Sequence, residues 1–199
     1  MAEAKLKTYK NITEEPLLKI EHDDDFESPR EWSNVGYFLT REDRHSSPDG
    51  EDNELYSIMI EAELNASDSE DHAKLIKKLA KEQGINVVAV HPINRYEHSS
   101  VSYSVGSASG FDSSNCGFYI VTEETAKEIG IKKAGLLKAI KQELEVYNQW
   151  VHGEVYRFTL FDKDGEIADS CCGFYEIEAI RDRLPKEWEN ENLEGYLVD

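Results

Sequence analysis

Apolar and polar residues follow one another in short blocks along the chain, and their spacing predicts a mixture of helices and strands. The clearest helices cover residues 67–84 and 134–150, where apolar side chains recur every three or four positions. Thr122 can cap a third, short helix, because the two acids that follow it suit a helix N-terminus. A last helix is expected near residues 176–183, since Pro185 would end it.

Strands are predicted where apolar runs or alternating residues lie between turn signals. Asp162-Lys163-Asp164-Gly165 separates two of them and is typical of a β-hairpin turn. Because strands and helices are mixed without a regular strand–helix–strand repeat, we expect an α+β fold with a mainly antiparallel mixed sheet packed by two to three helices. Residues 1–199 should form a single domain. The predicted strands cover residues 16–21, 34–40, 56–62, 85–90, 99–105, 117–121, 154–161 and 166–171.

The composition is that of a folded protein with a large negative charge. Hydrophobic residues make up 39% of the 199 positions, which is enough for a core. Lys and Arg number 22 against 41 Asp and Glu, which gives a net charge of −19. This charge argues against direct binding to a nucleic-acid backbone and against docking on an anionic membrane. No apolar run is long enough to span a membrane, and residues 1–10 lack the apolar core of a signal peptide.

The negative charge is concentrated in two segments. Residues 21–72 hold 17 acids and three arginines, a net charge of −14, and residues 187–199 hold five acids and no base. Residues 73–186 are nearly neutral, and we find no local basic stripe beside the three tryptophans and ten tyrosines, which we interpret as core and interface anchors. We expect residues 41–54 to form a flexible acidic loop and residues 187–199 an acidic tail. Acidic segments of this kind commonly lie on the solvated surface, but residues 21–72 also contain strand-like stretches.

Several local patterns together resemble an uncharacterised family of acidic proteins encoded by bacteriophages, plasmids and other mobile elements. The resemblance covers about residues 16–175, although Ser100 and Ser114 stand where the family typically has glycine. It implies an accessory protein in the bacterial cytoplasm and no established activity. The patterns are Ser28-Pro29-Arg30-Glu31-Trp32, Tyr96-Glu97-His98-Ser99, Phe111-Asp112-Ser113 with Gly117-Phe118, Glu145-Val146-Tyr147-Asn148-Gln149-Trp150, Gly153-Glu154-Val155-Tyr156 and Asp169-Ser170-Cys171-Cys172-Gly173-Phe174-Tyr175.

Evidence for catalysis in the sequence is weak. A hydrolytic site could combine a base, a nucleophile and an orienting carboxylate near Tyr96. Asp and Ser near strand ends are more often turn and capping residues, and the chain has no G-x-S-x-G or phosphate-loop motif. The candidates for such a site, or for a small-molecule or nucleotide-signal binding site, are His98, Ser99, Asp112, Ser113 and Asp169.

The cysteines and acidic clusters favour neither covalent nor metal chemistry. Cys116, Cys171 and Cys172 form no C-x-x-C pair and are expected to be reduced thiols, with Cys116 or Cys171 beside His98 the less favoured nucleophile interpretation. His22 with residues 23–25, and the acids of residues 162–166, do not complete a calcium-binding loop. We therefore expect no metal and no cofactor.

The leading hypothesis is a protein that binds and inhibits a host defence component, of the anti-restriction or anti-CRISPR type. A carboxylate array can occupy a basic groove that normally holds nucleic acid. The partner would be a host defence protein with such a groove, and the sequence does not define the oligomeric state. The partner-binding candidates are Asp23, Asp24, Asp25, Glu27, Glu42, Asp43, Glu51, Asp52 and Glu54.

Overall fold

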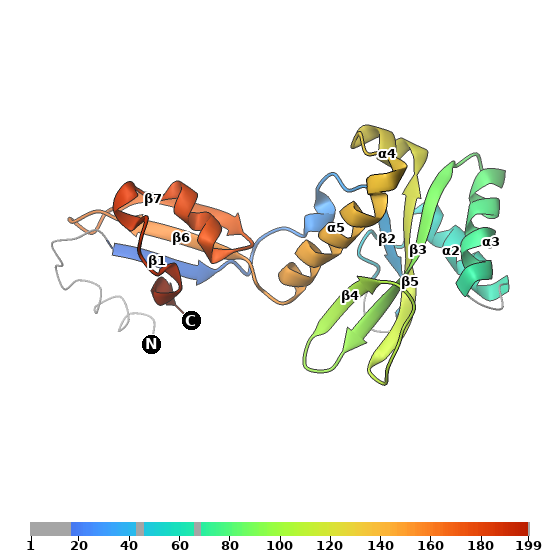
Figure 1. Cartoon of the computed structure of the whole chain (residues 1–199), viewed down its shortest axis with the longest axis horizontal. Helices are drawn as coiled ribbons and strands as arrows, with labels where there is room; N and C mark the ends of the chain where they lie inside the picture. The colour runs from blue at the N-terminus through green and yellow to red at the C-terminus, as the bar shows by residue number, and fades with distance from the viewer. Residues whose placement is uncertain (1–16, 43–45, 66–68, 199) are drawn as a thin grey trace. The chain divides into compact units, whose positions relative to one another are not determined.

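The computed structural model describes residues 17–42, 46–65 and 69–198, with the side chains of residues 69–71 excepted. The chain divides into two compact units. We call residues 28–152 the central unit, and residues 1–27 with 153–199 the terminal unit. Each unit has its own four-stranded sheet (Figure 1), so the expected α+β class is confirmed while the strands form two sheets instead of one. The single-domain organisation stays a prediction.

The central unit is a sheet with helices on both faces. Its strand order is β2-β5-β3-β4, and all three pairings are antiparallel. The strands are β2 (Tyr37–Thr40), β3 (Val87–Glu97), β4 (Val101–Val105) and β5 (Ser113–Thr122). The helices are α2 (Glu54–Asn65) and α3 (Ser69–Glu82) on one face, α5 (Leu136–Val151) on the other, and the short η2 (Pro29–Glu31), α4 (Glu123–Glu128) and η3 (Lys133–Gly135).

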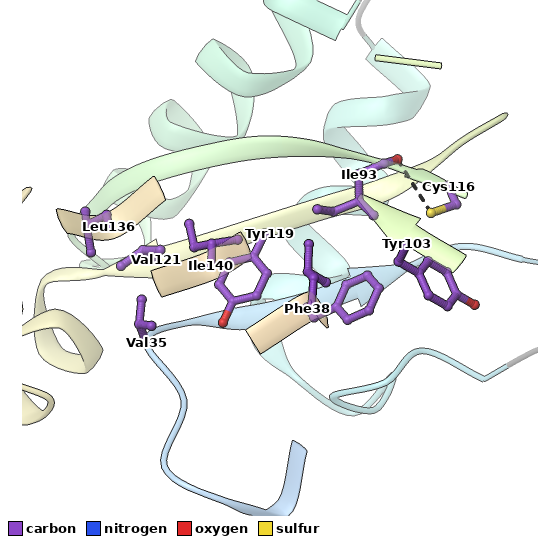
Figure 2. Packing of buried hydrophobic residues seen from close by; sticks show 10 residues of the cluster. Val35, Phe38, Ile93, Tyr103, Cys116, Tyr119, Val121, Leu136 and Ile140 are labelled. Carbon is purple, nitrogen blue, oxygen red and sulfur yellow. Dashed lines mark hydrogen bonds between the residues drawn. The ribbon is translucent and has the colours of Figure 1, made fainter. Parts of the chain in front are cut away.

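Two hydrophobic cores lie on opposite faces of this sheet because side chains alternate along each strand. Phe38 and Tyr119 pack with Ile140 of α5 on one face, as Figure 2 shows. Their chain neighbours Leu39 and Phe118 pack on the other face, under α2 and α3. The central strand β5 is therefore covered on both sides, which explains its continuous run of buried residues.

A buried arginine connects η2 to the rest of the central unit. The Arg30 side chain is 3% exposed, and its guanidinium donates to both carboxylate oxygens of Asp49, at 2.8 and 2.6 Å. It also donates to the backbone carbonyl of Gly36 at 2.7 Å and to Glu143 at 3.2 Å. Burial alone would lower the pKa of Arg30, but hydrogen bonds and charge from Asp49 and Tyr119 raise it above its ordinary value, so the group stays charged.

The acids around Arg30 are themselves held by other elements. Asp49 also accepts the backbone N–H of Phe38 in β2. Glu143 of α5 accepts the backbone N–H of Val35 at 2.8 Å and the hydroxyl of Tyr119. One guanidinium thus joins η2, the turn at residues 48–50, β2, β5 and α5.

Both edge strands of this sheet, β2 and β4, are held through their backbones. A Cβ added at Gly117 would lie 2.1 Å from the carbonyl oxygen of Leu39, so only glycine lets β2 approach β5 at this point. At the opposite edge, the Asn148 side chain of α5 pairs with the backbone N–H and carbonyl of Tyr103, at 2.8 and 2.9 Å. The amide therefore satisfies part of the edge of β4.

The terminal unit combines one strand from the start of the chain with the chain after residue 153. Its sheet order is β7-β6-β1-β8, antiparallel except for β1 with β8. Three 3₁₀ helices complete a core around Ile20, Phe158, Ile180, Trp188 and Leu193. The elements are β1 (Leu17–His22), β6 (Tyr156–Phe161), β7 (Ile167–Phe174), η4 (Ile177–Arg183), η5 (Lys186–Trp188), η6 (Leu193–Tyr196) and β8 (Leu197–Val198).

The segment after β1 is fastened to the end of β7. Gly173 adopts a positive φ of 79°, and its N–H donates to the Asp23 carboxylate at 3.3 Å. The Phe26 ring covers this glycine so closely that an added Cβ would lie 2.5 Å from it. The His22 ring lies 2.8 Å from the carbonyl oxygen of Gly153. Two of the patterns in the sequence, around Gly153 and Gly173, thus serve folding.

Three expectations from the sequence need correction. Residues 56–62 are not a strand but lie in α2, which buries Leu55, Ile58, Met59 and Ala62 at helical spacing. Within the loop 41–54, Asp49 is pinned by Arg30 rather than solvated. Residues 187–198 are not a free tail, because Trp188 and Leu193 are buried in the core of the terminal unit.

Replacing Arg30 with methionine should lower the free energy of unfolding by about 3–5 kcal/mol, because Asp49 and Glu143 would keep partly buried charges without their cation. Urea unfolding followed by circular dichroism measures the change. Arg41→Met is the control: its side chain is 55% exposed and pairs with Glu63 at 3.6 Å, a contact worth at most about 1 kcal/mol. Equal stability of the two variants would show that the Arg30 network is not essential.

Candidate functional site: an acidic surface on the terminal unit

The terminal unit carries most of the negative charge in a small volume. Its described residues, 17–27 and 153–198, include 17 acids and six bases, a net charge of −11. The described residues of the central unit are about twice as many, yet they include 18 acids and 12 bases, a net charge of −6. The difference in charge between the two units is therefore larger than the two acidic segments of the sequence indicate. Pairing of β1 with β6 brings acids from distant parts of the chain into one unit.

Most of these carboxylates face solvent. Among the residues of the terminal unit that the structure describes, fifteen acids are exposed, against four exposed bases, Arg157, Lys163, Arg183 and Lys186. Such a ratio gives the unit a strongly negative potential that falls off over a Debye length of about 8–10 Å at moderate salt. The exposed acids are Asp24, Asp25, Glu27, Glu154, Asp162, Asp164, Glu166, Asp169, Glu176, Glu178, Asp182, Glu187, Glu189, Glu191 and Glu194.

One arginine organises the acidic segment near the end of the chain. Arg181 donates to the backbone carbonyls of Trp188, Glu189 and Glu191, at 2.8, 3.0 and 3.1 Å. It also pairs with Glu178 at 2.7 Å. Because Trp188 is buried next to these carbonyls, the exposed acids of this segment stand on a folded backbone. The backbone that carries Glu187, Glu189 and Glu191 is therefore ordered.

The acidic hairpin turn between β6 and β7 is also ordered by its own side chains. Asp162 accepts the backbone N–H groups of Asp164 and Glu166, both at 2.9 Å. This is the hydrogen bonding of a turn, as expected from Asp162-Lys163-Asp164-Gly165. In the part of the chain that the structure describes, no group of three or more His, Cys, Asp or Glu side chains is arranged to hold a metal ion.

The structure sorts the predicted partner-binding acids into three groups. Asp24, Asp25 and Glu27 are exposed in the terminal unit, while Glu51, Asp52 and Glu54 are exposed at the start of α2 in the central unit. Asp43 lies outside the described residues. Asp23 and Glu42 are buried and are corrections to the prediction, because a partner cannot reach their carboxylates without unfolding local structure.

Glu42 belongs to a buried polar cluster in the central unit. Its side chain is 7% exposed, and one carboxylate oxygen lies 3.4 Å from Nε of Arg95. The Tyr103 hydroxyl donates to its other oxygen at 3.4 Å. Burial, with the nearby negative charge of Glu42, raises the pKa of Tyr103 above its ordinary value, so this hydroxyl stays a donor at neutral pH.

The structure brings part of the candidate hydrolytic site together. His98, in the β3–β4 turn, has Nδ1 at 3.6 Å from Oδ2 of Asp112, just before β5. Both side chains are exposed, at 71% and 43%, and the backbone N–H of Glu97 donates to the Asp112 carbonyl at 3.0 Å. Ser99 is exposed in the same turn, and Ser113 starts β5 opposite Tyr96. An exposed pair at this separation can orient an imidazole only weakly.

Asp169, the fifth candidate for that site, lies in the terminal unit. It is exposed on the edge strand β7, where its carboxylate accepts the backbone N–H of Ser170 at 2.8 Å. The contact satisfies an amide along the strand, which is a structural role for this side chain.

The cysteines are free, and they differ in exposure. Cys116 is buried, and its thiol donates to the backbone carbonyl of Ile93 at 3.5 Å (Figure 2). Burial raises the pKa of Cys116 to about 12, which keeps it a thiol rather than a nucleophilic thiolate. Cys171 is partly buried against the terminal core, whereas Cys172 is exposed.

The chain matches no protein-family model, no curated protein and no solved structure. The resemblance to phage and plasmid proteins therefore stays a prediction. Among the described residues, none of the helices has the length and apolar character that a membrane span requires.

At pH 8, a disulfide reagent such as Ellman's reagent should modify Cys172 quickly and leave Cys116 unmodified. A thiol with a pKa of about 12 is deprotonated roughly a thousandfold less at this pH than an ordinary cysteine, and its reactivity should rise as the pH increases. The Cys171→Ser/Cys172→Ser variant isolates Cys116 and should react only after urea is added. Rapid reaction of that folded variant would contradict burial of the thiol.

Proposed function

We propose that this chain is an accessory protein of a phage or other mobile element that binds and inhibits a host defence protein. The acidic surface of the terminal unit is the binding surface, and it competes for a basic groove that normally holds nucleic acid. The observation that carries this proposal is the set of fifteen exposed carboxylates, against four exposed bases, among the described residues 17–27 and 153–198 of that unit. The resemblance to mobile-element proteins supports the biological setting.

The chemistry of carboxylates suits such competition. Lys and Arg side chains that bind phosphates also bind carboxylates through charge-assisted hydrogen bonds, and a carboxylate offers a nuclease no bond to cleave. Dense like charges repel one another and destabilise the unit that carries them. A folded backbone that fixes them, as Arg181 and Trp188 do, lowers the ordering entropy lost on binding.

Neutralising six exposed acids of the terminal unit should weaken partner binding at least about tenfold, because several contacts worth a few tenths of a kcal/mol each would be lost. The change is Asp24→Asn, Asp25→Asn, Glu27→Gln, Glu187→Gln, Glu189→Gln and Glu194→Gln. The readout is phage plating on bacteria that carry a restriction or CRISPR system, with and without the expressed chain. Captured host protein should also be released by duplex DNA or by raising salt from about 0.1 to 0.5 M.

A matched control changes the same number of charges in the central unit. The control substitutions are Glu31→Gln, Glu61→Gln, Glu82→Gln, Glu124→Gln, Glu128→Gln and Glu145→Gln, all at exposed positions outside the partner-binding candidates. Inhibition should survive in this control. If the terminal-unit variant still protects phage as well as the unmodified chain, the acidic surface is not the inhibitory element.

The 3.6 Å approach of His98 to Asp112 favours a second candidate function, a small-molecule or nucleotide-signal binding protein or hydrolase. Under the leading proposal, His98→Ala and Asp112→Ala should leave both inhibition and melting temperature unchanged, since both side chains are exposed. Plating assays and thermal melts of the two variants measure this. Loss of activity without loss of stability would transfer the function to this pair.

A further inference from the structure

The outer strands of the two sheets differ in how their backbones are covered. In the central unit, Ser47 and Asp49 bond to backbone groups of β2, and Asn148 bonds to those of β4. In the terminal unit, β8 has only two residues, whereas β7 has eight. Among the described residues, Asp23 is the one group outside the β6–β7 hairpin that bonds to the backbone of β7, at the N–H of Gly173. Most of the β7 edge is therefore open.

The open edge of β7 has the properties of a strand that can pair with another strand. Its first four residues, 167–170, are all exposed, and the β-branched side chain of Ile167 is 65% exposed. Its regular pairing with β6 runs from Asp169 to Cys171, with a register shift at each end. Exposed edge strands pair readily with other chains, and folded proteins prevent this with bulges and with charged side chains on the edge. Both devices can therefore be looked for in β7.

Asp169 supplies a charge at the middle of this edge. It pairs with Leu160 in the ladder, and Leu160 is buried in the core, so the Asp169 side chain lies on the core side of the sheet at its exposed margin. Its carboxylate accepts the backbone N–H of Ser170 at 2.8 Å. The N–H groups of an antiparallel strand alternate between its two sides, and this one is directed at a side chain instead of at β6. A strand added to β7 would have to displace the carboxylate from this donor.

We infer that β7 is a pairing edge for a second copy of this chain, and that Asp169 holds it closed. Two β7 edges match each other about a two-fold axis at Ser170, because each Ser170 N–H can then donate to the Ser170 carbonyl of the other copy. The net charge of −11 on the described residues of the terminal unit adds repulsion between two copies. This role concerns the backbone of β7 and goes beyond the proposed binding of a host protein.

Sedimentation velocity of the full chain tests this inference at about 0.5 M salt, where a Debye length of about 4 Å screens the repulsion between copies. The unmodified chain should remain a monomer. Asp169→Val should form dimers whose share rises with concentration between about 10 and 500 µM, because valine frees the Ser170 N–H and favours strands. Asp169→Asn keeps an oxygen acceptor without the charge and should associate less than Asp169→Val. Asp169→Thr gives the same readout as valine if the valine variant precipitates.

Two controls separate strand pairing from a general effect of charge or apolar surface. Asp182→Val makes the same chemical change at an exposed position of η4 and should remain a monomer. Asp169→Val/Ser170→Pro also removes the N–H at Ser170, which an edge strand tolerates, and should return the monomer. Dimers of the unmodified chain or of Asp182→Val would overturn the inference. Folded Asp169→Val that stays monomeric, with circular dichroism unchanged, would also overturn it, as would dimers that survive the proline.

Discussion

The buried guanidinium of Arg30 is the interaction on which the central unit depends. A charged group this deep in a protein is tolerated only when its hydrogen bonds are satisfied, and here the partners are Asp49, Glu143 and the Gly36 carbonyl. The Ser28–Trp32 segment, the turn at residues 48–50 and α5 must therefore reach their places together. The Ser28–Trp32 segment therefore has a structural role. Asp49 is bound by Arg30 and is not part of an exposed acidic surface.

Local patterning was enough to predict the strongly periodic elements. Helices α3 and α5, the capped α4 and the β6–β7 hairpin all lie where their sequences indicate. Residues 56–62 failed because apolar residues at 56, 58, 60 and 62 alternate as in a strand, while those at 55, 58, 59 and 62 suit a helix. Only packing against α3 and the sheet separates the two patterns, and a single sequence does not contain those contacts.

The candidate site was less predictable than the fold, for a physical reason. The sequence shows only how charge is distributed along the chain. The acidic surface of the terminal unit forms when β1 pairs with β6, which brings distant parts of the chain together. The sequence also does not show which acidic side chains are exposed. Asp23 and Glu42 are buried, although nothing in the sequence distinguishes them from the acids beside them. Both units are negative, but the terminal unit concentrates its exposed carboxylates in fewer residues.

The positions of the terminal-unit strands along the chain also have a consequence for folding during synthesis. Strand β1 is synthesised early, but its partners β6 and β8 emerge more than one hundred residues later. The central unit has all its strands between residues 28 and 152 and can fold on the ribosome while β1 is still waiting. The acidic surface would then be assembled after the central unit, and a chain cut short before residue 197 would carry the acids without the edge strand β8.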